Sequence, residues 1–81
     1  MERVWVVKKI VTFPNEEPLM SISKIFNSLE KAMGYIKCIA IDRGVDIITD
    51  DGCVCTEWWE AGRNKYCDVE FWLDTDGITV Y

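Results

Sequence analysis

The alternation of apolar and polar residues predicts several strands around one helix. Residues 4–13 are rich in β-branched and aromatic side chains, which is typical of a strand. Every second residue of this segment points to the same face, and four of these residues are apolar: Trp5, Val7, Val11 and Phe13. Lys9 interrupts this apolar set. A lysine at that place predicts a β-bulge or an edge position. Residues 14–18 begin and end with proline and predict a loop. Residues 19–26 predict a returning strand, in which Ile22, Lys24 and Phe26 alternate with Ser21, Ser23 and Ile25.

Residues 27–44 carry the pattern of an amphipathic helix. Asn27 or Ser28 can accept backbone N–H bonds at the start, and Asn27 with Glu30 has the spacing of a capping box. Arg43 and Gly44 supply a basic last turn and a stop. The apolar positions recur at helical intervals: Leu29, Ala32, Met33, Ile36, Ile39 and Ala40. The pattern predicts a helix of about 15 residues packed on a sheet, with Gly34 allowing close approach to a strand.

The remaining residues predict four more strands joined by tight turns. Residues 45–49, 53–60, 65–74 and 78–81 alternate as strands do. Asp51-Gly52 is a strong hairpin signal, because both residues tolerate positive φ angles, and Asp76-Gly77 is a second turn signal. The sequence therefore predicts a single α+β domain over residues 1–81. Its order is β-β-α-β-β-β-β, and one amphipathic helix packs on a mainly antiparallel sheet.

The charge differs sharply between the two halves of the chain. Residues 1–41 hold six Lys/Arg and four Asp/Glu, whereas residues 42–81 hold three and ten, so the second half carries a net charge of −7. Phosphate binding needs clustered basic residues, and this chain has no such run. Direct binding to nucleic acid or to an anionic membrane is therefore not expected. An acidic surface instead attracts basic proteins, among which nucleic-acid-binding proteins are common.

The predicted hairpin of residues 53–74 concentrates acidic and aromatic side chains on one face. If residues 62 and 63 form a two-residue loop, Trp59 lies opposite Tyr66 and Thr56 lies opposite Val69. The apolar set of this hairpin then faces the core. The opposite face carries the candidate partner-binding residues Glu57, Trp59, Tyr66, Asp68, Glu70 and Trp72. Trp and Tyr are common anchors of protein interfaces, and carboxylates steer a basic partner.

Two other interpretations of these residues stand beside the binding role. Cross-strand aromatic pairs stabilise a sheet without any partner, and aspartates are frequent in turns for local reasons. Spaced carboxylates on a rigid sheet can also imitate the phosphates of a duplex. Further aspartates could extend such a track from the helix end across the turns: Asp42, Asp46, Asp50, Asp51, Asp74 and Asp76.

The residues needed for catalysis or for a metal site are sparse. The chain contains no histidine, so histidine-dependent nucleophilic catalysis is excluded. A zinc site would need paired knuckles, but the four cysteines supply only Cys53-Val54-Cys55 as a close pair. We expect them to act as small buried apolar residues. Asp74-Thr75-Asp76-Gly77 is a fragment of a calcium loop and is expected to be a turn. Neither an enzyme activity, a metal nor a cofactor is predicted.

The first forty residues carry a resemblance. Val4-Trp5-Val6-Val7, followed by Ile25-Phe26-Asn27-Ser28-Leu29-Glu30-Lys31-Ala32 and an apolar helix, resembles small proteins of bacteriophages and prophages. In those proteins a strand pair leads through a similar helix start into further strands. The resemblance implies an origin in a mobile element. It also implies a role like that of small acidic phage inhibitors of host defence or host nucleic-acid enzymes, anti-CRISPR proteins among them.

These observations lead to three functional hypotheses. The first is an inhibitor in the host cytosol that binds a host protein with a basic surface. The second is a self-associating structural protein, a homodimer for example, that uses the same face. The third is capture of a small ligand such as a nucleotide, for which the acidic half offers only Arg43, Arg63 and Lys65 as basic groups. The start of the chain has no signal-peptide pattern, and the sequence has no apolar run long enough to span a bilayer.

Overall fold

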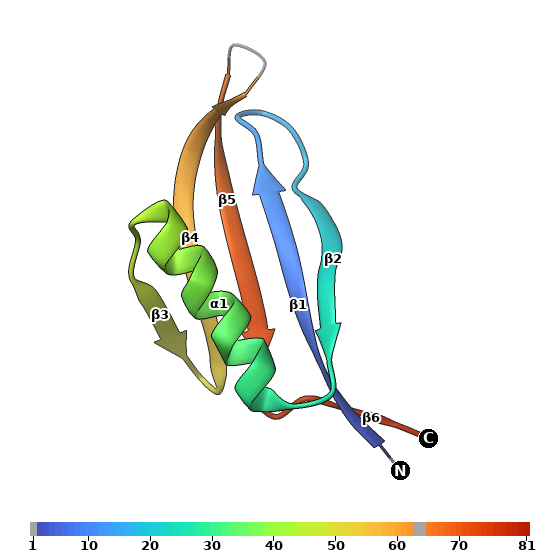
Figure 1. Ribbon diagram of the computed structural model, residues 1–81. Coiled ribbons are helices and arrows are strands. Elements are labelled where there is room, and N and C mark those ends of the chain that lie inside the picture. The colour runs from blue at the N-terminus through green and yellow to red at the C-terminus, as the bar shows by residue number, and fades with distance from the viewer. Residues whose placement is uncertain (1, 63–64) are drawn as a thin grey trace.

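One helix packs on one face of an antiparallel sheet, as the sequence predicts (Figure 1). The computed structural model describes residues 2–62 and 65–81. The only helix in these residues is α1 (Leu29–Arg43). The strands are β1 (Glu2–Thr12), β2 (Leu19–Phe26), β3 (Ile47–Asp50), β4 (Cys53–Gly62), β5 (Lys65–Asp74) and β6 (Ile78–Val80). The predicted α+β class and element order are confirmed, and the bounds of β2 and β5 match the prediction.

The strand order places the first strand inside the sheet, between the second and the fifth. The order is β2-β1-β5-β4-β3, and β6 pairs with the start of β1. β1 therefore pairs with β2 on one side and with β5 on the other. The pairing of β6 with the start of β1 brings the two ends of the chain side by side, at the same end of the molecule (Figure 1).

A β-bulge changes which residues of β2 share a face. Val7 pairs with Lys24, but the next residue, Lys8, pairs with Ile22, so Ser23 is the extra residue. The predicted bulge or edge position at Lys9 is therefore wrong in its place: the register shift lies between Val7 and Lys8, its extra residue belongs to β2, and β1 has a neighbour on each side. The simple alternation of residues 19–26 is also wrong, because the bulge moves Ile22 to the face opposite Lys24. Ser23 Oγ instead lies 2.9 Å from the hydroxyl of Tyr35 on the helix.

The helix begins and ends where its sequence signals lie. Ser28, one of the two predicted caps, accepts a hydrogen bond from the backbone N–H of Lys31 on its side-chain oxygen. Gly44 follows the last turn with φ 67°, and its N–H donates to backbone carbonyls of that turn. Such a left-handed residue satisfies carbonyls that the helix end would leave unpaired. Both caps are local, which explains why the sequence predicts the bounds so closely.

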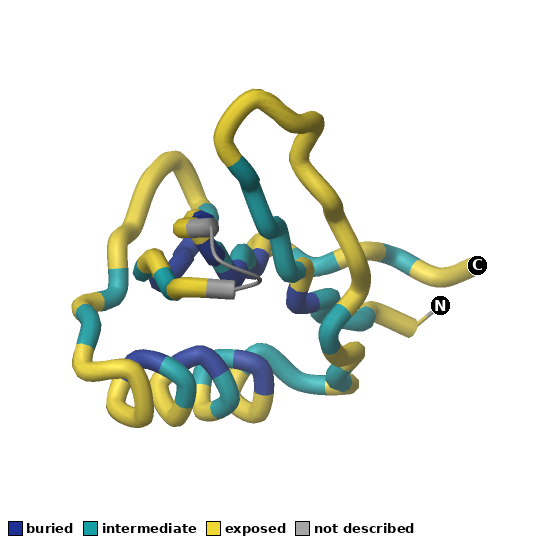
Figure 2. Tube along the Cα trace, turned by 90° about the horizontal axis from the view of Figure 1, so that it is seen from above, coloured by how far each residue is buried: buried dark blue, intermediate teal, exposed yellow. Residues whose placement is uncertain are grey.

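The core lies between α1 and the helix-facing side of β1, β4 and β5. Three residues of α1 are buried against it: Ala32, Ile36 and Ala40. Val7, Val54, Val69, Phe71 and Leu73 form the sheet side of this core. Figure 2 shows buried residues on the sheet side of the helix and exposed residues on its outer side. Lys9 joins this face at its border and extends its ammonium over the Phe71 ring, 5.8 Å from the centroid.

The predicted role of Gly34 is wrong. Gly34 is exposed, and a Cβ built on it meets nothing within 4 Å. It therefore permits no close approach and only adds flexibility to the helix. Gly34→Ala is expected to raise the free energy of unfolding by about 1 kcal/mol, because glycine inside a helix loses more conformational entropy on folding than alanine. Urea unfolding followed by circular dichroism measures this change, and an unchanged or lower midpoint would contradict it.

Candidate functional site

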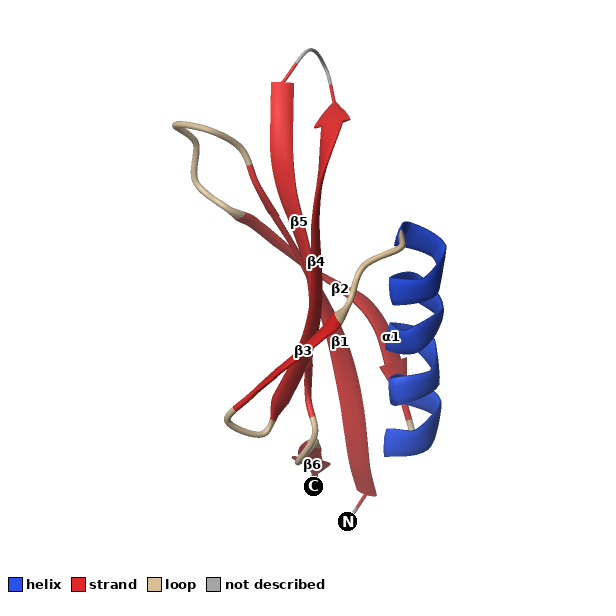
Figure 3. Cartoon of the chain, turned by 90° about the vertical axis from the view of Figure 1, so that its left-hand side faces the viewer, coloured by secondary structure: helices blue, strands red, loops and turns tan. Residues whose placement is uncertain are grey.

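The sheet face that points away from the helix has no covering element in the described part of the chain. Figure 3, seen along the sheet, places α1 on one side and leaves the other side open. We call this second side the open face. On the neighbouring strands β4 and β5, it carries residues Cys53, Cys55, Glu57, Trp59 and Ala61 of β4, and Tyr66, Asp68, Glu70 and Trp72 of β5.

All six candidate partner-binding residues lie on the open face. The β4–β5 register pairs Glu57 with Glu70, Trp59 with Asp68, and Cys55 with Trp72. The predicted register is wrong by two residues, because a loop of residues 62 and 63 would pair Trp59 with Tyr66, whereas Trp59 pairs with Asp68. The prediction had placed Arg63 in the loop, and Arg63 lies outside the described residues. A shift of two residues preserves the side on which each residue lies, so the predicted core and open faces are both confirmed.

An exposed aromatic pair occupies the end of the open face nearest the β4–β5 turn. Trp59 and Tyr66 retain 66% and 64% of their accessible surface. Their rings meet edge to face with centroids 5.1 Å apart. Beside them lies a pocket of about 420 Å³, lined by Thr12, Phe13, Pro14, Trp59, Tyr66 and Asp68. Most of this lining is apolar, and Asp68 is the one charged residue in it among those the structure describes.

The centre of the open face sets two carboxylates directly opposite each other. Glu57 and Glu70 are a cross-strand pair, and like charges in that position destabilise a sheet. Trp72 donates its indole N–H to Glu70 at 3.1 Å, which holds that carboxylate in place. Trp72 is only partly exposed. The same face thus combines acidic groups with aromatic rings on both sides of them.

Beneath these carboxylates lies a protected thiol. Cys55 is 1% exposed, between its sheet neighbours Ile48 and Trp72. Burial raises the pKa of this thiol to about 11, and the nearby Glu57 and Glu70 carboxylates act in the same direction. The thiol also donates a weak hydrogen bond to Glu57 at 3.9 Å. The thiolate is the reactive form, so this raised pKa disfavours reaction of Cys55 at neutral pH.

The predicted aspartate track is divided by the fold. Asp50 and Asp74 both pair with Cys53, so they extend the open face at the end opposite the aromatic pair. The two turns that follow them lie together, because Thr75 donates its backbone N–H to the carbonyl of Gly52 at 2.9 Å. Asp42 lies in the last turn of α1 and Asp46 in the connection to β3. A continuous track from the helix end is therefore not formed.

An aliphatic flank adjoins the acidic part of the open face, and sequence reasoning missed it. Met20 pairs with Ile10, and Ile22 pairs with Lys8. Met20 and Ile22 are 66% and 63% exposed, and Ile25 is exposed near them. The missing signal was the bulge at Ser23, because without it Ile22 would fall on the helix side. The open face therefore offers apolar, acidic and aromatic areas next to one another.

The other candidate chemistries are not assembled. Cys55 and Cys67 are buried as predicted, but Cys38 is exposed on the helix and Cys53 only half-buried, so for these two the prediction of burial fails. Cys53 and Cys55 lie on the open face, whereas Cys67 belongs to the core. Among residues 2–62 and 65–81, no group of three or more acidic or cysteine side chains is arranged to hold a metal ion. Asp74-Thr75-Asp76-Gly77 forms a turn, in which Gly77 donates to the Asp74 carbonyl.

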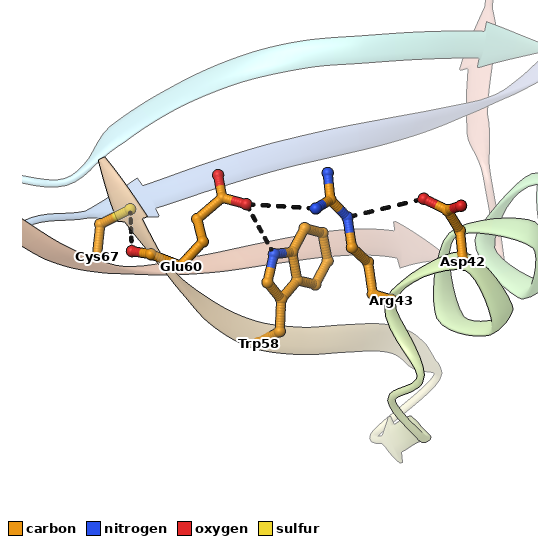
Figure 4. A network of polar contacts seen from close by, with 5 residues as sticks. All are labelled: Asp42, Arg43, Trp58, Glu60 and Cys67. Carbon is orange, nitrogen blue, oxygen red and sulfur yellow. Dashed lines mark hydrogen bonds and ion pairs between the residues drawn. The ribbon is translucent and has the colours of Figure 1, made fainter. Parts of the chain in front are cut away.

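Arg43, one of the three basic residues considered for a nucleotide, is engaged on the helix side of the sheet. Its guanidinium lies 5.0 Å from the centroid of the Trp58 ring and bonds the Glu60 carboxylate at 3.4 Å. Trp58 donates its indole N–H to the same Glu60 oxygen at 3.3 Å (Figure 4). This contact fastens the end of α1 to β4, and it removes Arg43 from the open face.

The only helix in the described residues, α1, is too short to cross a membrane, and no span was found. No family model, curated protein or solved structure matches the chain. The function is therefore inferred from the geometry of the open face.

Proposed function

We propose that this chain is a binding module whose open face docks on the basic surface of another protein. The observation that carries the proposal is the union, on one uncovered face, of exposed Trp59 and Tyr66 with Glu57, Asp68 and Glu70. Aromatic anchors supply binding energy, and carboxylates around them orient a basic partner. A phage-type inhibitor of a host nucleic-acid-binding or defence protein in the host cytosol is the role that this chemistry fits.

The Glu57–Glu70 pair supports this proposal energetically. Two carboxylates opposite each other disfavour the isolated sheet, and a neutral pair would be more favourable for folding alone. A partner's Lys or Arg placed between them would turn that repulsion into attraction. Residues that break a rule of local stability are concentrated at functional sites. The placement of these two acids is thus easier to explain by binding than by folding.

The charge contribution is tested with two doubly neutralised variants. Glu57→Gln with Glu70→Gln removes two charges from the open face, whereas Glu30→Gln with Asp46→Asn removes two exposed charges near the helix. We expect the first pair to weaken binding about tenfold at low salt and the difference to shrink at high salt. Affinity capture from a host lysate at two salt concentrations identifies the partner, and calorimetry measures its affinity for each variant.

The control pair separates local from general charge effects. Both variants carry the same net charge, so equal weakening would mean that only net charge matters, and the open face would lose its assignment. Unfolding midpoints of both variants are measured in parallel. The Glu57/Glu70 variant is expected to be at least as stable as the unmodified protein, because it removes the like-charge pair.

Self-association is a second candidate, favoured by the aliphatic flank of Met20, Ile22 and Ile25. Exposed apolar residues next to one another often mark an interface between proteins. β2 is an edge strand, but its bulge and Lys24 oppose pairing edge to edge, so a dimer would pack face to face. Sedimentation velocity at several concentrations distinguishes the candidates, since a monomer at every concentration would exclude this one.

A further inference from the structure

The pocket between the aromatic pair and the end of β1 combines two features that recognise a cation. Trp59 and Tyr66 present aromatic rings, and Asp68 supplies a carboxylate at the same pocket. Aromatic faces attract cations through their quadrupole, and a carboxylate accepts hydrogen bonds from a cation that carries N–H groups. No lysine or arginine lines the pocket among the residues that the structure describes. Among the described lining residues, the pocket therefore combines aromatic rings and a carboxylate with no basic side chain.

The helix side of the same strand contains the same combination with its cation in place. There Trp58 and the Glu60 carboxylate receive the guanidinium of Arg43, with contacts of 5.0 Å and 3.4 Å (Figure 4). Trp59 and Asp68 repeat the tryptophan and the carboxylate on the open face, as a cross-strand pair. This internal example shows that a tryptophan ring and a carboxylate of this chain together receive a guanidinium on the helix side.

We propose that the pocket of Thr12, Phe13, Pro14, Trp59, Tyr66 and Asp68 binds one arginine side chain of the partner. This inference rests on the proposed function and names the group that anchors it. A planar guanidinium stacks on an aromatic ring and directs its N–H fork to a carboxylate, which a lysine ammonium cannot do as well. The exposed edge-to-face pair of Trp59 and Tyr66 provides the ring surface, and Asp68 accepts the N–H groups.

The test uses a capped arginine, N-acetyl-arginine methylamide, as the probe. Its capped citrulline analogue has nearly the same shape but no charge, and the capped lysine has the charge without the planar fork. The readout is the indole N–H signal of Trp59 in ¹H–¹⁵N spectra, assigned with Trp59→Phe. We expect saturable shifts at millimolar concentrations of the capped arginine. The affinity of the citrulline analogue is expected to be about fivefold weaker than that of arginine, and the affinity of lysine is also expected to be weaker than that of arginine.

Two carboxylate variants locate the site. Asp68→Asn is expected to weaken arginine binding about fivefold, whereas Asp74→Asn, an open-face carboxylate outside the pocket, leaves it unchanged. Absence of a saturable shift, equal binding of citrulline, tighter binding of lysine, or equal effects of the two variants would each overturn the arginine assignment.

The outcomes also separate this inference from the proposed function. If the probe fails while Glu57→Gln with Glu70→Gln still weakens the partner complex, the open face remains the binding surface and only the arginine anchor is wrong. If the probe binds while that double variant leaves the complex unchanged, the pocket binds an arginine side chain, and the role of Glu57 and Glu70 in docking the partner is wrong.

Discussion

Trp59→Ala combined with Trp72→Ala is expected to weaken partner binding about a hundredfold or more. Each tryptophan is a large aromatic side chain on the open face. Truncating such an anchor at the centre of an interface costs about 2 kcal/mol or more of binding free energy. The effects of two such substitutions are not additive, so a hundredfold rise of the dissociation constant is the lower bound expected for the double variant. Calorimetry with the captured partner measures it.

The matched control removes exposed apolar side chains from elsewhere on the molecule. Ile41 on the outer side of α1 is 81% exposed, and Tyr81 at the chain end is also exposed. Ile41→Ala with Tyr81→Ala is expected to leave the affinity unchanged. Circular dichroism of both double variants verifies the fold, and full affinity in the tryptophan variant would refute the binding role of the open face.

Gly77→Ala is expected to lower the free energy of unfolding by about 2–4 kcal/mol. Gly77 has φ 76°, and an added Cβ would lie 2.9 Å from both Arg3 Cγ and the Trp5 ring. The left-handed conformation alone costs a non-glycine residue about 1–2 kcal/mol, and the contact with a ring adds overpacking strain. Trp5 cannot easily move away, because its indole N–H donates to the Thr75 carbonyl at 3.0 Å.

Gly44→Ala is the control for this effect. Gly44 has a similar φ of 67°, but an added Cβ meets nothing within 4 Å. Its substitution is expected to cost only the backbone share, about 1–2 kcal/mol. Chemical unfolding of the two variants therefore measures the contribution of the Trp5 contact, and equal losses would mean that the turn accommodates the methyl group without strain.

If the expected effects of the Glu57/Glu70 and the Trp59/Trp72 variants hold, one face of the sheet serves stability and the other serves binding. The helix-facing side contains the buried core and the Arg43–Trp58–Glu60 contact that fastens α1. The open face contains the like-charge pair and the exposed rings of Trp59 and Tyr66. Substitutions on the open face should therefore change binding far more than stability, and the opposite holds for the other side.

The sequence by itself determined the elements that depend on neighbouring residues. Ser28 and Gly44 set the ends of the helix because their capping bonds join residues only a few positions apart. Asp51 and Gly52 have φ 43° and 80°, as the predicted hairpin turn requires. Period-two alternation also assigned the faces of β4 and β5, which survive a register error of two residues.

The tertiary structure alone decided which segments lie beside the six predicted residues of the open face. The pocket joins residues 12–14 to β4 and β5 only because β1 pairs with β5 in the middle of the sheet. The bulge at Ser23 turns Ile22 outward, and it exists only in the pairing of β1 with β2. Strand order and register are set by burial and hydrogen-bond pairing between residues that lie far apart in the sequence. Local periodicity contains no information on them, since it specifies the face of a residue and not its neighbour across the sheet.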